Sequence, residues 1–210
     1  MNLKIVQAGH PVLRQGARPL TAEEILSPVV QQLIAHMRDT MRDAPGVGLA
    51  APQIGLPMQL AVIEDREEFL ANIPVERLTE RERYPVPFMV LANPKIVEVS
   101  EETAEFFEGC LSVEGFSALV KRSRRVTVEF LDEQARPHRI EATGWFARIL
   151  QHEIDHLHGH LYIDRMETRS FATMDNMSRY WNKPGNKPGT VHSIPDFEWI
   201  VAPENRKSPF

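Results

Sequence analysis

The segment 144–158, GWFARILQHEIDHLH, constrains the fold more strongly than any other stretch of the chain. His152 and His156 are four residues apart, so they lie on one face of the helix that this segment predicts. Gly159 follows as a good C-terminal stop. Apolar residues line one side of the helix and flank the histidines: Trp145, Phe146, Ile149, Leu150, Ile154 and Leu157. The segment therefore predicts a buried helix whose two histidines bind one metal ion.

The motif His152-Glu153-x-x-His156 can also arise by chance, because the chain contains 8 histidines. In that case both histidines would be ordinary helix residues. The amphipathic context favours the metal site, since His-Glu-x-x-His on a helix is a pattern of metallohydrolases. His158 and His160, at the end of this segment and just after it, are expected to be surface or strand-entry residues and not ligands.

A catalytic metal site of this type usually has three protein ligands and one open position. The metzincin pattern would place its third histidine at position 162, where this chain has Tyr162. A thermolysin-like site needs a glutamate on a following helix, but Glu167 is too near the motif and Glu198 lies in a Pro-rich tail. The remaining soft ligand is Cys110, which could equally be a buried, inert thiol.

The pattern along the chain predicts an α+β fold, with antiparallel or mixed sheets packed around the C-terminal helix. An N-terminal amphipathic helix is expected over 23–41, and Pro28 moves its start toward Ser27. The Gly- and Pro-rich stretch 44–57 cannot be a regular helix. Strands are expected at 58–64, 88–92, 95–99, 104–107, 117–121, 125–131 and 137–143.

We expect one catalytic domain over residues 1–180 and a Pro-rich extension, not a separate domain, over 181–210. Residues 65–87 are charged and predict a long surface excursion with a helical turn near 75–81. This excursion and the tail are candidates for shaping a substrate groove, for dimerisation or for a transient ribosome contact. The sequence does not choose among these roles, and it leaves the oligomeric state open.

Composition excludes several classes of function. The formal net charge is -5, and the basic run 121–125 is short enough for a solvated loop, so we expect no direct nucleic-acid binding. The lone Cys110 cannot form an intramolecular disulfide. No apolar run approaches a membrane span, and the first residues resemble neither a signal nor a transit peptide, so we expect a cytoplasmic protein.

Three motifs, including the one around His152 and His156, carry a family resemblance. GVGLAAPQIG (46–55), EGCLS (108–112) and QHEIDHLHG (151–159) resemble the three signature motifs of peptide deformylase, in the same order and at similar spacing. HPVLR (10–14), LANP (91–94) and GWFARILQHE (144–153) extend the resemblance to roughly residues 3–178. EGCLSVEGF with GWFARIL is similar to the branch that includes organellar and some bacterial enzymes.

The resemblance implies that Cys110, His152 and His156 hold one Fe(II) ion, with Zn(II) or Ni(II) able to substitute. It implies that Glu153 is the general base and that the Gln53 amide and the Leu111 backbone N–H stabilise the oxyanion. Without the resemblance, Gln53 would be interpreted as a polar loop residue that caps its own turn. The implied substrates are N-formylmethionyl nascent peptides, which lose formate. The groove is implied to use Gly46, Val47, Gly48, Glu108, Gly109, Leu111, Ile149 and His152.

Two other classes of function compete with this interpretation. A metallopeptidase that cleaves internal peptide bonds would need a third His or Glu ligand. A non-enzymatic metal-binding domain would need a fourth protein ligand to close the site, and His138 is remote in the pattern. Asp155 could be a plain solvent-facing residue, but we expect it to pair with a cation such as Arg122 and so hold the strand against the helix.

Overall fold

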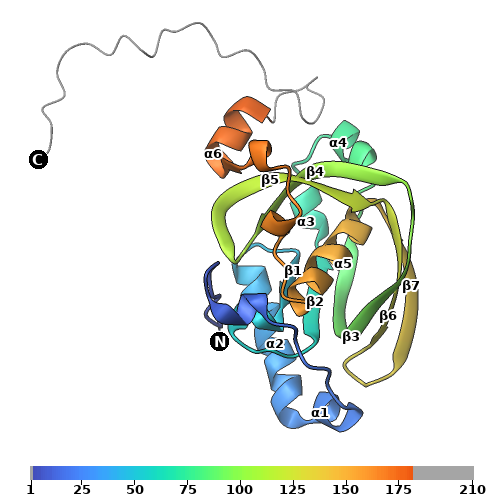
Figure 1. The fold of residues 1–210 in the computed structure, drawn as a ribbon. Helices are drawn as coiled ribbons and strands as arrows, with labels where there is room; N and C mark the ends of the chain where they lie inside the picture. Colours follow the sequence, from blue (N-terminus) through green and yellow to red (C-terminus); the bar gives the residue numbers. More distant parts are fainter. Residues whose placement is uncertain (1, 182–210) are drawn as a thin grey trace, which may run out of the picture.

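The computed structural model describes residues 2–181, and it contains two antiparallel sheets and several helices (Figure 1). The first sheet has the strand order β1-β2-β3-β6-β7 and the second has the order β4-β5-β8. The predicted α+β class is therefore confirmed. The strands are β1 (Gly48–Ala50), β2 (Leu60–Asp65), β3 (Val86–Val99), β4 (Thr103–Cys110), β5 (Val113–Ser123), β6 (Arg125–Leu131), β7 (Pro137–Thr143) and β8 (Ala172–Thr173).

The strands expected at 88–92 and 95–99 form one strand, β3. The sequence suggested a break at Asn93-Pro94. In the structure the register shifts there, Asn93 adopts a φ of 51°, and its side chain exchanges hydrogen bonds with the backbone of Leu20. The irregularity is a bulge that keeps the strand continuous. The short strands β1 and β8 were not predicted, because strands of three and two residues are too short to show an alternation of apolar and polar residues.

The main N-terminal helix starts at Pro28, as predicted, but a separate short helix, which was not predicted, precedes it. Thr21 forms a capping box with Glu24 at the start of α1 (Ala22–Leu26), and Ser27 caps α2 (Pro28–Asp43). Pro at the first helical position lacks only an N–H that would have no partner in any case. The apolar face of α2 packs on β1 and β2.

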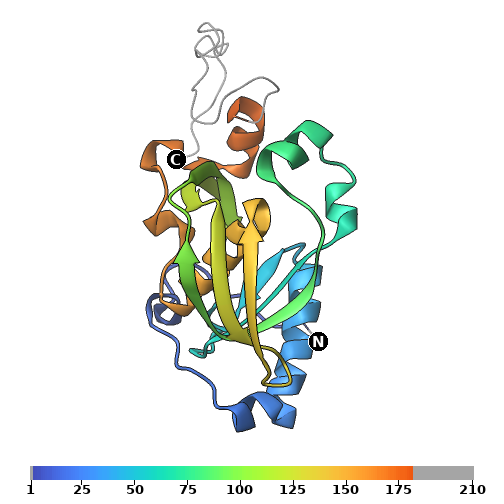
Figure 2. The same ribbon diagram turned by 90° about the vertical axis from the view of Figure 1, so that its right-hand side faces the viewer.

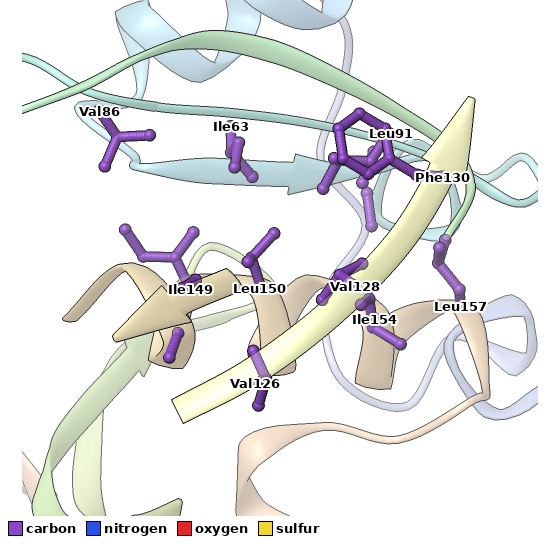
Figure 3. Packing of buried hydrophobic residues seen from close by; sticks show 14 of the residues in the cluster. Ile63, Val86, Leu91, Val126, Val128, Phe130, Ile149, Leu150, Ile154 and Leu157 are labelled. Atoms are coloured by element: carbon purple, nitrogen blue, oxygen red, sulfur yellow. The ribbon is translucent and has the colours of Figure 1, made fainter. Parts of the chain in front are cut away.

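The predicted C-terminal helix is α5 (Gly144–Leu157), followed by Gly159 at a φ of 78°. It contacts five strands, β1, β2, β3, β6 and β7, of the first sheet and also β5 of the second sheet. Figure 3 shows Ile149, Leu150, Ile154 and Leu157 facing the side chains of Ile63, Val86 and Leu91 across this core. The helix that carries His152, Glu153 and His156 is thus held on several sides by packed strands.

The excursion 65–87 contains α3 (Glu67–Leu70) and α4 (Val75–Arg81), so the predicted turn near 75–81 is a helix. It packs against α5 instead of extending freely into solvent. Buried Asp65 pairs with Arg83, and the guanidinium groups of Arg81 and Arg83 lie 5.0 and 5.2 Å from the centre of the Trp145 ring. Figure 2 shows α3 and α4, in green, at the end of the molecule opposite α1.

Short helical turns complete the fold: η1 (Pro11–Arg14), η2 (Ala51–Ile54), η3 (Tyr162–Asp164), η4 (Thr168–Ser170), α6 (Met174–Asn176) and η5 (Met177–Trp181). The predicted extension 181–210 lies outside the described residues except for its first residue. Across residues 2–181, no helix has the length and apolar character needed to cross a membrane.

Candidate active site

Helix α5 and the end of strand β4 bring three potential metal ligands together. One donor atom each of Cys110, His152 and His156 lies within 4.8 Å of the other two. The Cys110 Sγ and the His156 Nε2 are 3.4 Å apart. Cys110 is distant in sequence from the two histidines, and the four-residue spacing of the histidines on α5 lets both face the end of β4.

This geometry fits a tetrahedral ion. Bonds of about 2.3 Å to sulfur and about 2.1 Å to nitrogen place the two donors about 3.6 Å apart. Burial lowers the pKa of His156 well below its usual value, which favours the neutral imidazole that binds metals. The Nδ1 atom of His152 lies 2.9 Å from the Glu108 carboxylate, so its Nε2 is left to face the cluster. The described residues offer Cys, His and His and no further ligand at this point, which leaves one coordination position open.

Glu108 is the centre of a buried charge network. Its carboxylate accepts hydrogen bonds from Arg122 at 2.9 Å and from Arg148 at 2.6 Å, in addition to its contact with His152. Burial alone would raise the pKa of Glu108, but the hydrogen bonds from His152 and Arg122 hold it well below its usual range. Glu108 therefore stays ionised and fixes the ring of His152.

The predicted pairing of Asp155 with Arg122 is present. Asp155 also accepts two hydrogen bonds from Arg165, at 2.7 and 2.8 Å. Arg122 lies on β5 and contacts both Glu108 and Asp155, so it joins the strand to the metal-binding helix.

Glu153 faces the cluster from α5, with its side chain buried and its Oε2 atom without a hydrogen-bond partner. Burial raises its pKa to about 7, although the charge of His152 acts in the opposite direction. A carboxyl group with a pKa near neutrality can both accept and release a proton at physiological pH. Its neighbour across the site is Gly48 of β1, whose missing side chain leaves room for the carboxyl group.

The Gln53 side chain caps its own turn, which is one of the two roles that the sequence suggested. Its Oε1 accepts a hydrogen bond of 2.9 Å from the Ala50 N–H and so caps its own turn. This contact fixes the amide, and the Nε2 is then directed at the Cys110 Sγ, at 3.4 Å, and at the Ser112 Oγ, at 3.3 Å. Leu111 lies beside it, in the two-residue connection between β4 and β5.

A cavity of about 720 Å³ opens over the cluster. All the sequence-predicted site residues except His156 line it: Gly46, Val47, Gly48, Gln53, Glu108, Gly109, Cys110, Leu111, Ile149, His152 and Glu153. The sequence motifs did not single out Gln7, Phe107, Trp145 or Arg148 for the site, yet these residues line it as well. Trp145 and Arg148 could have been found, because they precede His152 by about two turns and one turn on the same helix face.

The other candidate ligands lie elsewhere. Glu167 caps η4, His138 contacts Asp132 at the β6–β7 turn, and His158 is exposed. The Tyr162 ring stacks on His152 with centroids 6.4 Å apart, so Tyr162 supports the site instead of binding the metal. Glu198 is outside the described residues.

A model of the family described as polypeptide deformylase matches residues 2–172. The chain belongs to this family. It is 47% identical over 173 residues to a protein of Solanum lycopersicum named peptide deformylase 1A, chloroplastic, an alignment that covers 82% of this chain and 62% of the relative. It is 49% identical to peptide deformylase 3 of Streptomyces avermitilis, over 87% of this chain and 79% of the relative.

Solved deformylase structures have the same fold. The class I type b enzyme of Acinetobacter baumannii, crystallised with Met-Ala-Ser, superposes with a TM-score of 0.70 at 32% identity, covering 79% of this chain and 99% of that one. The enzyme of Synechococcus elongatus in complex with actinonin gives a TM-score of 0.67 at 40% identity, covering 80% of each chain. This chain spans only 62% and 65% of the length of the tomato and Arabidopsis thaliana relatives.

Proposed function

We propose that this chain is a peptide deformylase, which hydrolyses the formyl amide of N-formylmethionyl polypeptides and releases formate. The observation that carries the proposal is the cluster of Cys110, His152 and His156 with the buried Glu153 carboxyl group beside it, at the base of a groove. Family membership supports the same reaction. A third His or Glu ligand, which a metallopeptidase would need, is not found near the cluster among residues 2–181.

The metal would be held by Cys110, His152 and His156, and we propose Fe(II), with Zn(II) or Ni(II) able to replace it. The mixed thiolate and imidazole donor set suits either iron or zinc. When bound there, the ion polarises a carbonyl oxygen and lowers the pKa of water toward neutrality.

Glu153 would transfer a proton from the attacking water to the departing amine. Its unpartnered Oε2 is free to accept a proton from the attacking water, and a pKa of about 7 lets the same group return it to the departing amine nitrogen. Gly48 leaves the carboxyl group room on the side of β1.

Gln53 and Leu111 would stabilise the negative charge that develops on the formyl oxygen. The Gln53 Nε2 is already oriented by the Ala50 N–H, and Leu111 follows the metal-binding Cys110 directly. Donors that are held in place before the reaction need no reorganisation during it.

The substrate would bind as an added strand. Among the described residues, β1 lies at one edge of the first sheet and β4 at one edge of the second, and both strands border the cavity. Gly46 and Gly48 on one side and Gly109 on the other allow another backbone to approach closely. Val47, Ile149 and Glu108 would bound the pocket for the methionine side chain, together with Leu111 and His152.

The experiment measures formate release from a short N-formyl-Met peptide by anaerobically purified, Fe(II)-loaded protein. We expect rapid formate release while the internal peptide bonds stay intact, as followed by mass spectrometry. Protein loaded in the same way but carrying Glu153→Gln is the matched control and should release little formate. Cleavage of internal bonds, or no formate from protein with a full complement of metal, would contradict the proposal.

The domain limits, the cellular location and the partners stay predictions. We propose one catalytic domain over 1–180 and an extension over 181–210. We also propose that the protein is cytoplasmic. Matching relatives include chloroplastic and mitochondrial proteins, so fractionation in the source organism is the test of location. Co-sedimentation with ribosomes would test the transient ribosome contact.

A further inference from the structure

Residues 6–8 form a strap that joins two segments of the active site. The Val6 N–H donates a hydrogen bond of 2.8 Å to the Gln53 carbonyl, and the Ala8 N–H donates one of 2.7 Å to the Ser112 carbonyl. The strap therefore connects the turn that carries Gln53 with the connection between β4 and β5 that carries Leu111. These are the two segments that supply the proposed oxyanion donors.

The Gln7 side chain adds two contacts from the same strap. Its Nε2 donates a hydrogen bond of 2.9 Å to the Leu111 carbonyl, and its Oε1 accepts one of 3.2 Å from the Glu114 N–H. Its own carbonyl accepts a bond from the His10 N–H at 3.0 Å, which fixes the direction of the strap at this residue. One side-chain amide thus bridges residues 111 and 114.

The connection that Gln7 bridges needs such support. Only Leu111 and Ser112 join β4 to β5, and the strand register shifts between Gly109 and Cys110. The Leu111 N–H lies in the peptide plane that Leu111 shares with Cys110, and the Leu111 carbonyl lies in the next plane. The Gln7 hydrogen bond holds that second plane, so it limits how the two planes can rotate relative to each other about the Leu111 Cα. On the other side, the Leu111 side chain lies close to Gly46, where a Cβ would be 3.0 Å from its Cδ1. Leu111 is therefore held between the Gln7 amide and the opposite wall of the groove.

We propose that Gln7 is a positioning residue for the Leu111 N–H. The inference rests on the proposed function, because it assigns that N–H to the oxyanion. A donor that is present but misdirected stabilises the transition state less, while the residues proposed to bound the methionine pocket stay the same. Loss of the Gln7 contacts should therefore lower kcat and leave KM near its original value.

Two variants separate the contacts. Gln7→Ala removes both hydrogen bonds. Gln7→Glu keeps an acceptor for the Glu114 N–H but loses the donor to the Leu111 carbonyl and places a negative charge against it. Gln134→Ala is the matched control, since Gln134 is exposed in the β6–β7 turn and its side chain bonds to its neighbour Glu133. The backbone bonds of Val6 and Ala8 remain in every variant, so the strap should stay in place.

For both Gln7 variants we expect kcat to fall about tenfold with KM within about twofold, a smaller loss than the roughly 100- to 1,000-fold cost of removing an oxyanion donor. Gln134→Ala should match the unaltered protein. Metal content should be the same in all proteins. Amide hydrogen exchange, followed by NMR, should show faster exchange at Glu114 in Gln7→Ala and retained protection in Gln7→Glu.

Three results would overturn the proposal. An increase in KM at unchanged kcat would mean that Gln7 touches the substrate. Unchanged kcat in either variant would mean that the contact with Leu111 is only structural. Unchanged exchange at Glu114 in Gln7→Ala would mean that the bridge does not order the turn. Failure of the unaltered protein to release formate would instead count against the proposed function, and the exchange result would still decide whether Gln7 holds the turn.

Discussion

The backbone of Gly48 lies against the carboxyl group of Glu153. A Cβ at position 48 would be 2.1 Å from the Glu153 Oε1 and 2.5 Å from its Cδ, far inside any allowed contact. An added methyl group would therefore displace the Glu153 side chain, and no positive φ is involved, since Gly48 is absent from the residues in that region. β1 thus limits where the Glu153 carboxyl group can lie.

Gly48→Ala should therefore move the Glu153 carboxyl group away from the metal cluster. We expect kcat/KM for the formyl peptide to fall about 100-fold, the loss typical of a displacement near 1 Å. Gly16→Ala is the neutral control, because a Cβ there would have no atom within 4 Å and the φ of Gly16 is ordinary. Gly46→Ala should give a smaller loss, since the new Cβ meets mainly the flexible end of Leu111. Equal activity of Gly48→Ala and Gly16→Ala would show that β1 yields to the added methyl group.

Glu153→Gln should separate catalysis from stability. The substitution keeps the shape of the side chain but removes the proton acceptor, so we expect kcat to fall roughly 100- to 10,000-fold. Metal content should be unchanged, because Glu153 is not part of the ligand cluster. The thermal midpoint should not decrease, since the substitution removes an ionisable group that is buried without a partner on Oε2. Glu101→Gln, at an exposed position, is the control. A variant with near-normal kcat would exclude Glu153 as the general base.

Local patterns predicted much of the fold. The strands expected at 125–131 and 137–143 match β6 and β7 at both ends, and the helix around the histidines matches α5 to within one residue. In these segments the hydrophobic period, the turn residues and the terminal glycine all favour the same structure. The helix start at Pro28 was predictable for the same reason.

Contacts between distant segments were not predictable from local patterns. Cys110 fits both a metal ligand and an inert thiol when its own surroundings are considered alone, because nothing in them indicates that α5 lies beside it. The excursion 65–87 looked solvated by its charge, yet Arg81 and Arg83 lie against Trp145, where a guanidinium group is stabilised by an aromatic ring. Gln7 gave no signal at all, since its side-chain contacts are with residues more than 100 positions away.

Asp155→Asn tests the buried charge network. The Asp155 carboxylate accepts hydrogen bonds from both Arg122 and Arg165, whereas an amide offers one oxygen and no charge. We expect the free energy of unfolding to fall by about 1–3 kcal/mol, the usual cost of weakening buried charged hydrogen bonds. Asp39→Asn is the control, because the Asp39 side chain is 44% exposed and pairs with its neighbour Arg38. Chemical denaturation measures the free energy of unfolding of both variants. Unchanged stability and activity in Asp155→Asn would refute the idea that Asp155 holds β5 against α5.

Gly144→Ala tests whether the excursion is firmly seated on the start of α5. At a φ of 56°, a Cβ on Gly144 would lie 2.3 Å from the Glu82 Cβ and 2.7 Å from the Arg81 carbonyl oxygen, so the substitution adds a clash to an unfavourable backbone angle. We expect a loss of about 2–4 kcal/mol in the free energy of unfolding. Gly55→Ala separates the two causes, since its φ of 86° is also left-handed but no atom lies within 4 Å. It should cost only about 1 kcal/mol. Equal losses in the two variants would mean that the excursion moves aside easily, and a larger loss at Gly144 would show that α4 and α5 form one rigid unit.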